Sequence, residues 1–175
     1  MMKGRHWRHW LMIGITLLGI QIAHAGSSIT VPVYLVSTTG PGQEIGTVKF
    51  TNAFGGVLVT PNLHGLSPGA HGFHIHVNPS CADNGMAAGG HLDPAKTEKH
   101  EGPYQKGHLG DMPVLVVDQN GTATLPVLAP RFTLSDIKGH SLIIHAGGDN
   151  YSDQPEKLGG GGARIACGVI PAKAK

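Results

Sequence analysis

Short runs of alternating hydrophobic and polar residues, separated by turn residues, dominate the chain after its first 25 residues. Across residues 29–35, apolar side chains alternate with Thr30, Pro32 and Tyr34, which is the period of a strand buried on one face. Seven further segments have a similar character: 47–51, 57–60, 72–77, 114–118, 122–127, 142–146 and 164–170. No segment shows a long helical period, so the pattern predicts an all-β domain of about eight antiparallel strands, in a sandwich or barrel.

Turn signals and two long segments complete this picture. Residues 118–121, Asp-Gln-Asn-Gly, lie between two predicted strands and indicate a hairpin. Residues 78–113 and 146–163 show neither period and are rich in glycine. Loops this long inside a compact domain are usually functional or disordered, and we expect these two to be functional.

The first 25 residues have the order of a secretory signal peptide. Lys3, Arg5 and Arg8 form a basic start, residues 10–20 are apolar, and residues 23–25 are Ala-His-Ala, a small-x-small ending. The alternative is a retained membrane anchor, but the apolar run is short for a bilayer span. We expect cleavage after residue 25.

The mature domain, residues 26–175, should therefore be exported and free of the membrane. Three of the 13 basic residues lie in the leader, so the mature domain carries ten against 11 acidic residues, a net charge of −1. This balance gives no electrostatic support to a nucleic-acid partner. With 40% hydrophobic and 14% charged residues, the chain fits neither intrinsic disorder nor a polytopic membrane protein.

Export also bears on the two cysteines, Cys81 and Cys167. An oxidising compartment favours joining them in a disulfide, and two buried free thiols are the alternative.

Histidines concentrate in one strand and the two long loops. His74 and His76 are two residues apart in a predicted strand, so both imidazoles project from one face while Phe73, Ile75 and Val77 face the core. His145 ends the apolar strand 142–146.

The first long loop supplies the remaining candidate ligands, His91, His100, His108 and Asp111. Three neutral imidazoles and a carboxylate suit tetrahedral zinc. Any one of these histidines could instead be a surface or hydrogen-bonded residue. Together they predict a metal centre.

The mature chain resembles the bacterial periplasmic copper/zinc superoxide dismutases over nearly its whole length. The motifs that carry the resemblance are GFHIH at 72–76, GGHLDP at 89–94, GHLGDMP at 107–113, HAGGDN at 145–150 and GGGGARIACG at 159–168. The resemblance implies an eight-stranded antiparallel Greek-key barrel, an immunoglobulin-like sandwich, located in the periplasm. The resemblance does not decide whether the protein is a monomer or a homodimer.

The resemblance also implies two ligand sets that share one histidine. Copper would be held by His74, His76, His91 and His145. Zinc would be held by His91, His100, His108 and Asp111. The imidazole of His91 would thus bridge the two metals.

Further residues take roles from the same resemblance. Asp149 is expected to accept hydrogen bonds from one copper and one zinc histidine. Arg164 resembles the family's anion-guiding arginine, and Lys96, Lys99 and Lys106 are expected to add to the attracting field. The implied reaction converts superoxide to dioxygen and hydrogen peroxide, with copper changing by one electron, zinc structural, and His91 taking up and returning a proton.

Two other functions are weighed against this one. A non-enzymatic copper/zinc carrier would not need a bridging imidazole, an anion-guiding arginine or a complete zinc set, and all three are present. A metal hydrolase lacks support because no H-E-x-x-H motif accompanies the ligands.

His64 stands outside both metal sets. It is either an exposed turn residue or a second ligand site, for instance for haem iron, which accepts an axial imidazole.

Overall fold

A computed structural model describes residues 27–173, and the predicted leader lies outside the described residues. Nine strands are present in this part of the chain: β1 Ser28–Ser37, β2 Gly40–Ala53, β3 Gly56–Leu63, β4 Gly69–His71, β5 Phe73–His76, β6 Leu115–Val117, β7 Val127–Ala129, β8 Ser141–His145 and β9 Arg164–Val169. The helical turns are short: η1 Met86–Ala88, α1 Leu134–Ile137 and η2 Lys157–Gly160. No described helix is long and apolar enough to cross a membrane.

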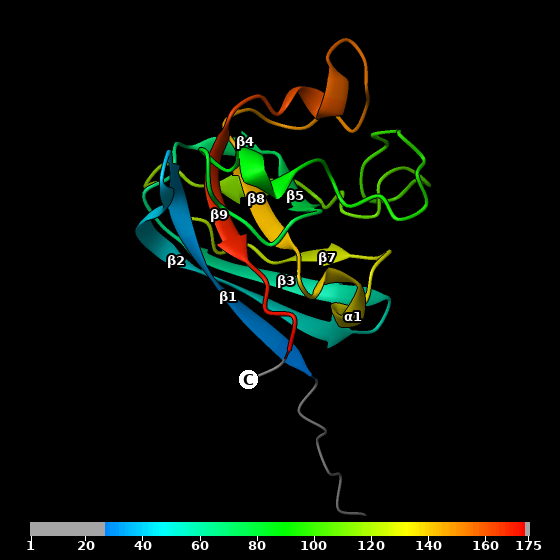
Figure 1. The fold of residues 1–175 in the computed structure, drawn as a ribbon, viewed down its shortest axis with the longest axis horizontal. Helices are drawn as coiled ribbons and strands as arrows, with labels where there is room; N and C mark the ends of the chain where they lie inside the picture. The colour runs from blue at the N-terminus through cyan, green and yellow to red at the C-terminus, as the bar shows by residue number, and fades with distance from the viewer. Residues whose placement is uncertain (1–26, 174–175) are drawn as a thin grey trace, which may run out of the picture.

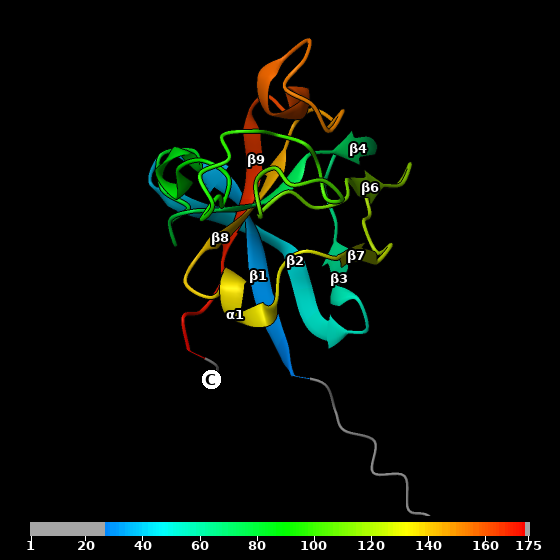
Figure 2. The same cartoon turned by 90° about the vertical axis from the view of Figure 1, so that its right-hand side faces the viewer.

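The strands form a curled antiparallel sheet in the order β5-β8-β9-β1-β2-β3-β7, with β4 and β6 paired separately (Figures 1 and 2). Some neighbouring strands are far apart in sequence, such as β1 and β9, so the chain crosses from one part of the sheet to another between them. This arrangement confirms the all-β Greek-key barrel class. The ninth strand is β4, whose three residues are too few to show a period.

One predicted strand was wrong, and one hairpin was only half right. Residues 122–127 are mostly irregular, and the strand in this region is β7. Pro126 lacks the N–H that a strand ladder needs. The turn at 118–121 is present, since Gly121 donates its N–H to the Asp118 carbonyl at 3.0 Å, but β6 pairs with β4 and β7 pairs with β3.

The core fills the concave side of the curled sheet. Val31 and Val33 of β1 are fully buried, as are Phe73 and Ile75 of β5. Val77 lies beyond the end of β5 and is 43% exposed, so its predicted place in the core was wrong. His74 and His76 are also fully buried, because the long loops cover the face of β5 that the core does not.

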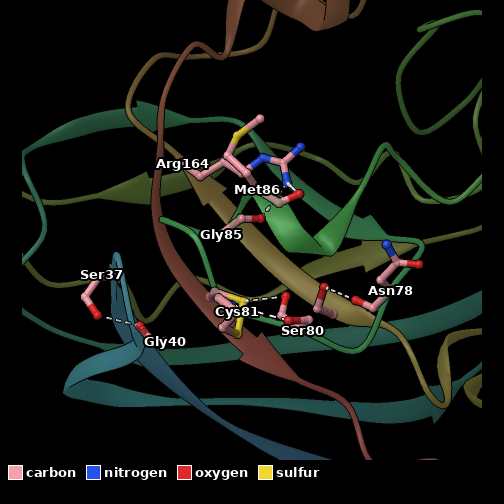
Figure 3. Close-up of a disulfide and its surroundings, with 11 residues drawn as sticks. Ser37, Gly40, Asn78, Ser80, Cys81, Gly85, Met86 and Arg164 are labelled. Carbon is pink, nitrogen blue, oxygen red and sulfur yellow. Dashed lines mark hydrogen bonds between the residues drawn. A yellow bond between two sulfur atoms is a disulfide. The ribbon is translucent and has the colours of Figure 1, made fainter.

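A disulfide between Cys81 and Cys167 ties the first long loop to β9 (Figure 3). It spans 86 residues of sequence, and a cross-link over a loop of this length stabilises a fold by about 4 kcal/mol. Ile143 and Ala88 pack around the two buried cysteines. The loop therefore begins from a fixed point beside β8 and β9.

Candidate metal centre

The first long loop lies against β5 through two isolated bridges. His76 pairs with His91, and His74 pairs with Asp111, so two loop residues sit directly opposite the two strand histidines. His145 reaches the same place from the end of β8, where its N–H donates to the Gly72 carbonyl at 2.9 Å. Strand pairing and the loop bridges together bring distant histidines into one cluster.

Two groups of buried ligand atoms result. One nitrogen each of His74, His76, His91 and His145 lie within 4.8 Å of one another. A second group with the same spacing contains His74, His91, His100 and Asp111. His108 adjoins this second group, with its Nδ1 3.5 Å from an Asp111 carboxylate oxygen.

Unpaired polar atoms divide these residues into two sets. Among the described residues, seven buried side-chain atoms have no hydrogen-bond partner, and all seven belong to the predicted ligands. Four are His74 Nδ1, His76 Nε2, His91 Nε2 and His145 Nε2. The other three are His100 Nδ1, His108 Nδ1 and Asp111 Oδ2.

A buried polar atom without a partner costs about 1–3 kcal/mol, so seven in one place need an explanation. A bound cation satisfies such lone pairs, and the donor set of imidazoles and one carboxylate fits copper and zinc. The other nitrogen of His74, Nε2, is bonded to Asp149, which belongs to neither set, so His74 has one nitrogen left for a cation, and this favours His108 over His74 in the second set. His91 faces both sets, since its Nδ1 lies 2.9 Å from Asp111 Oδ1.

The opposite ring nitrogens are held by oxygen atoms. His76 Nδ1 donates to the Gly89 carbonyl at 2.9 Å, and His145 Nδ1 to the Gly162 carbonyl at 3.2 Å. Each of these bonds fixes the tautomer that leaves the other nitrogen with its lone pair free.

Asp149 links the two sets. Its two carboxylate oxygens each lie 2.8 Å from a ring nitrogen, one from His74 Nε2 and the other from His100 Nε2. Gly159 packs so closely here that a Cβ would come within 2.0 Å of Asp149 Oδ1, at a φ of +72°. Asp149 therefore lies between one histidine of each set, and its role beside bound metals stays a prediction.

Burial keeps the first set neutral. It lowers the pKa of His74 to about 3 and that of His145 to about 4, and it also lowers the pKa of His76 and His91. Neutral imidazoles are the form that binds metal.

The second set, unlike the first, contains charged groups. Although burial lowers the pKa of His100, the neighbouring carboxylates of Asp111 and Asp149 outweigh this and raise the pKa to about 9. Burial raises the pKa of the Asp111 and Asp149 carboxyls, but their histidine partners outweigh this and hold each pKa well below its usual range. Asp111 and Asp149 are therefore ionised throughout the neutral range.

A hollow of about 280 Å³ opens from the first set to the surface. Its lining includes His76, His91, His145 and Arg164. Arg164 donates at 2.6 Å to the Gly85 carbonyl and at 2.6 Å to the Gly89 carbonyl, which fixes its guanidinium at the opening; Figure 3 shows the contact with Gly85.

Lys157 is a cation of this opening that the sequence analysis missed. It lines the hollow beside Leu158 and Arg164, whereas Lys96, Lys99 and Lys106 do not line it. Its position in the second long loop, just before the run of four glycines, was the available signal. The long-range contribution of the other three lysines stays a prediction.

The remaining histidines lie outside the cluster. His71 has its ring nitrogens 2.7 Å from the His145 carbonyl and 2.8 Å from the Ser67 carbonyl. His140 Nδ1 lies 2.6 Å from the Val77 carbonyl. His64 is exposed, just beyond β3, with Nδ1 2.5 Å from the Ile45 carbonyl, and it lines a separate hollow of about 310 Å³.

Comparisons with known proteins agree with this geometry. The family model described as copper/zinc superoxide dismutase (SODC) matches residues 44–170. "Superoxide dismutase [Cu-Zn] 1" of Salmonella typhimurium is 56% identical over 158 residues, covering 85% of this chain and 89% of the relative. "Superoxide dismutase [Cu-Zn]" of Haemophilus parainfluenzae is 48% identical over 186 residues, covering 97% of this chain and 100% of the relative.

Solved structures show the same similarity. The copper/zinc superoxide dismutase of Brucella abortus has a TM-score of 0.79 at 50% identity, covering 82% of this chain and 99% of that one. The monomeric enzyme of Salmonella enterica has a TM-score of 0.73 at 55% identity, with the same coverage. The curled sheet, the buried ligand atoms and these likenesses together show that the chain belongs to the copper/zinc superoxide dismutase family.

Proposed function

We propose that the two sets of unpaired atoms are the metal ligands of this enzyme. Copper is assigned to His74, His76, His91 and His145, and zinc to His91, His100, His108 and Asp111. The reaction of the family is the dismutation of superoxide to dioxygen and hydrogen peroxide, and its metals are copper and zinc. The observation that carries the assignment is that all seven unpaired buried side-chain atoms among residues 27–173 fall in these sets.

Bound copper supplies the one-electron chemistry, which zinc does not. His91 can supply one of the two protons that hydrogen peroxide needs, and water supplies the other. His91 Nε2 is buried and unpaired, and His91 lines the hollow, so whenever Nε2 is not bound to copper it can hold a proton there and deliver it to a reduced anion. Asp111 Oδ1 lies 2.9 Å from His91 Nδ1, and a zinc ion held by both residues would keep the ring in place with or without a proton on Nε2.

Arg164 and Lys157 bring the substrate to the hollow. Superoxide is a small anion that offers little surface for binding, so attraction by fixed positive charge governs its arrival. The guanidinium of Arg164 stays charged at all relevant pH values and is held by two carbonyls at the opening.

The leader and the disulfide support a location outside the cytoplasm. Disulfides persist in oxidising compartments, and the bacterial relatives make the periplasm the location that we propose. Amino-terminal sequencing of the exported protein should begin at Gly26.

His64 is proposed separately as a ligand for haem iron. Its Nδ1 faces the Ile45 carbonyl, so Nε2 is the nitrogen that could bind iron, and the exposed residue lines a hollow. Titration with haemin, followed by the visible absorption of the bound iron, should show weaker binding by His64→Ala and no change in His140→Ala. Equal binding by wild type and His64→Ala would remove the proposal.

The copper assignment is tested by His145→Ala in metal-loaded protein. Because His145 supplies one of four nitrogens and lies outside the zinc set, we expect superoxide decay in pulse radiolysis to fall to the level of free copper while zinc stays bound. Retention of wild-type decay would show that copper binds elsewhere. The wild-type rate should also fall as salt rises, because salt screens the attraction of the anion.

A further inference from the structure

Arg131 makes an unusual set of contacts with the first long loop. It follows β7 and is half-buried, and its guanidinium donates four hydrogen bonds, all to backbone carbonyls. Nε reaches Pro103 at 3.1 Å, Nη1 reaches Gly107 at 3.0 Å, Nη2 reaches Gly102 at 3.2 Å, and Nη2 also reaches the carbonyl of His108. Every ion pair found among residues 27–173 joins a histidine to an aspartate, so Arg131 has no carboxylate partner there.

The loop needs these donors because it has no regular structure of its own. Residues 99–108 contain neither strand nor helix and project from the barrel (Figure 1). The loop closes on itself where the His108 N–H donates to the Lys99 carbonyl at 2.9 Å. Gly107 lies so close to this closure that a Cβ would be 2.4 Å from the Lys99 carbonyl oxygen.

His100 and His108 lie at the two ends of this closed loop. Arg131 binds three carbonyls between them and the carbonyl of His108 itself. Four bonds from one rigid, planar group fix the relative positions of the loop carbonyls better than single contacts from separate side chains could. We infer that Arg131 is a positioning residue for the zinc half of the centre, setting the loop so that His100 and His108 converge on Asp111. This inference rests on the zinc assignment proposed above.

The charge of Arg131 works against this role, which makes the inference testable. A fixed positive charge near a cation site weakens cation binding. If charge dominated, its removal would strengthen zinc binding. If the geometry of the guanidinium hydrogen bonds dominates, zinc binding weakens whether the charge is kept, as in Arg131→Lys, or removed, as in Arg131→Gln.

The test measures zinc affinity by chelator competition in copper-loaded protein, together with the visible spectrum of Co²⁺ placed in the zinc site. We expect both Arg131 variants to lose zinc affinity by roughly 10–100-fold, the range for groups that orient metal ligands, with copper affinity unchanged. The Co²⁺ spectrum should change, since its ligands are displaced. Arg164→Lys is the matched control, because Arg164 also binds carbonyls but beside the copper set, and its zinc affinity should equal that of wild type.

Three results would overturn the inference: unchanged zinc affinity in both variants, tighter zinc binding by Arg131→Gln, or an equal loss of both metals. If Arg131→Gln fails to fold, Arg131→Lys carries the test, since it keeps the charge and the apolar stem. Failure of the zinc assignment is seen separately in His108→Ala, which would then bind zinc as wild type does.

Discussion

At the scale of single residues, Arg164 and Lys157 differ in how firmly they are held. The guanidinium of Arg164 is held by two carbonyls at 2.6 Å, whereas the Lys157 side chain lines the same hollow and makes no hydrogen bond within residues 27–173. A fixed charge orients an anion as well as attracting it, so the two cations should contribute unequally.

We therefore expect Arg164→Met to lower the rate constant for superoxide decay by about tenfold or more, the lower bound for electrostatic steering, and to flatten its salt dependence. Lys157→Met should lower the rate less and keep most of the salt dependence. Pulse radiolysis across a series of salt concentrations measures both effects. An equal loss in the two variants would mean that attraction alone, without orientation, matters.

At the scale of elements, Asp153 joins the two long loops. One carboxylate oxygen accepts the His100 N–H at 2.9 Å, and the other accepts the Leu158 N–H at 3.1 Å. A ligand of the proposed zinc set and the rim of the copper hollow thus share one side chain.

Removing this link in Asp153→Ala should loosen both loops. Each lost bond to a charged group costs about 1.5–3 kcal/mol, so amide exchange of residues 146–163 should accelerate by roughly tenfold or more. Hydrogen exchange followed by mass spectrometry measures it, with Glu156→Ala in the same loop as control. Acceleration confined to residues 99–108 would show that the second loop is held by other contacts.

The elements also show which features of this chain can be predicted from its sequence. Strands with clear alternation, such as β1, were predicted. The histidines and the aspartate that cluster in the structure were also picked out, because strand and loop motifs carry them, and their assignment to metals stays a prediction. β4 was missed because three residues have no period. The contacts of Arg131 and Asp153 and the position of Lys157 were missed because they depend on where irregular loops fold back, and irregular backbone leaves no repeating pattern in sequence.

At the scale of the whole molecule, the disulfide and the proposed metal sites both hold the first long loop. Cys81→Ser combined with Cys167→Ser should lower the free energy of unfolding by about 4 kcal/mol, since it frees a closed loop of 86 residues. Urea unfolding of the metal-loaded protein measures this, with reduced and oxidised wild type as the comparison. A loss below ~1 kcal/mol would mean that the metals alone hold the first loop in place.

The stability of the metal-free protein should itself depend on pH in two opposite ways. The pKa of His74 is lowered to about 3 and that of His145 to about 4, from an ordinary value of 6.5. Between pH 6.5 and 4 the unfolded chain binds these protons and the folded chain does not. Stability is therefore full above pH 6.5 and falls as the pH decreases, by up to about 1.4 kcal/mol per histidine and pH unit.

His100 acts in the other direction because its pKa is raised to about 9. Its contribution is full below pH 6.5 and is lost as the pH rises through 9. Urea midpoints of chelator-treated protein between pH 4.5 and 9.5 should therefore peak near pH 6.5. His100→Gln should flatten the alkaline side and leave the acid side steep, since His74 and His145 remain. A profile that is level below pH 6.5 would mean that these two histidines are open to protons in the metal-free fold, and that bound metal is what closes the centre.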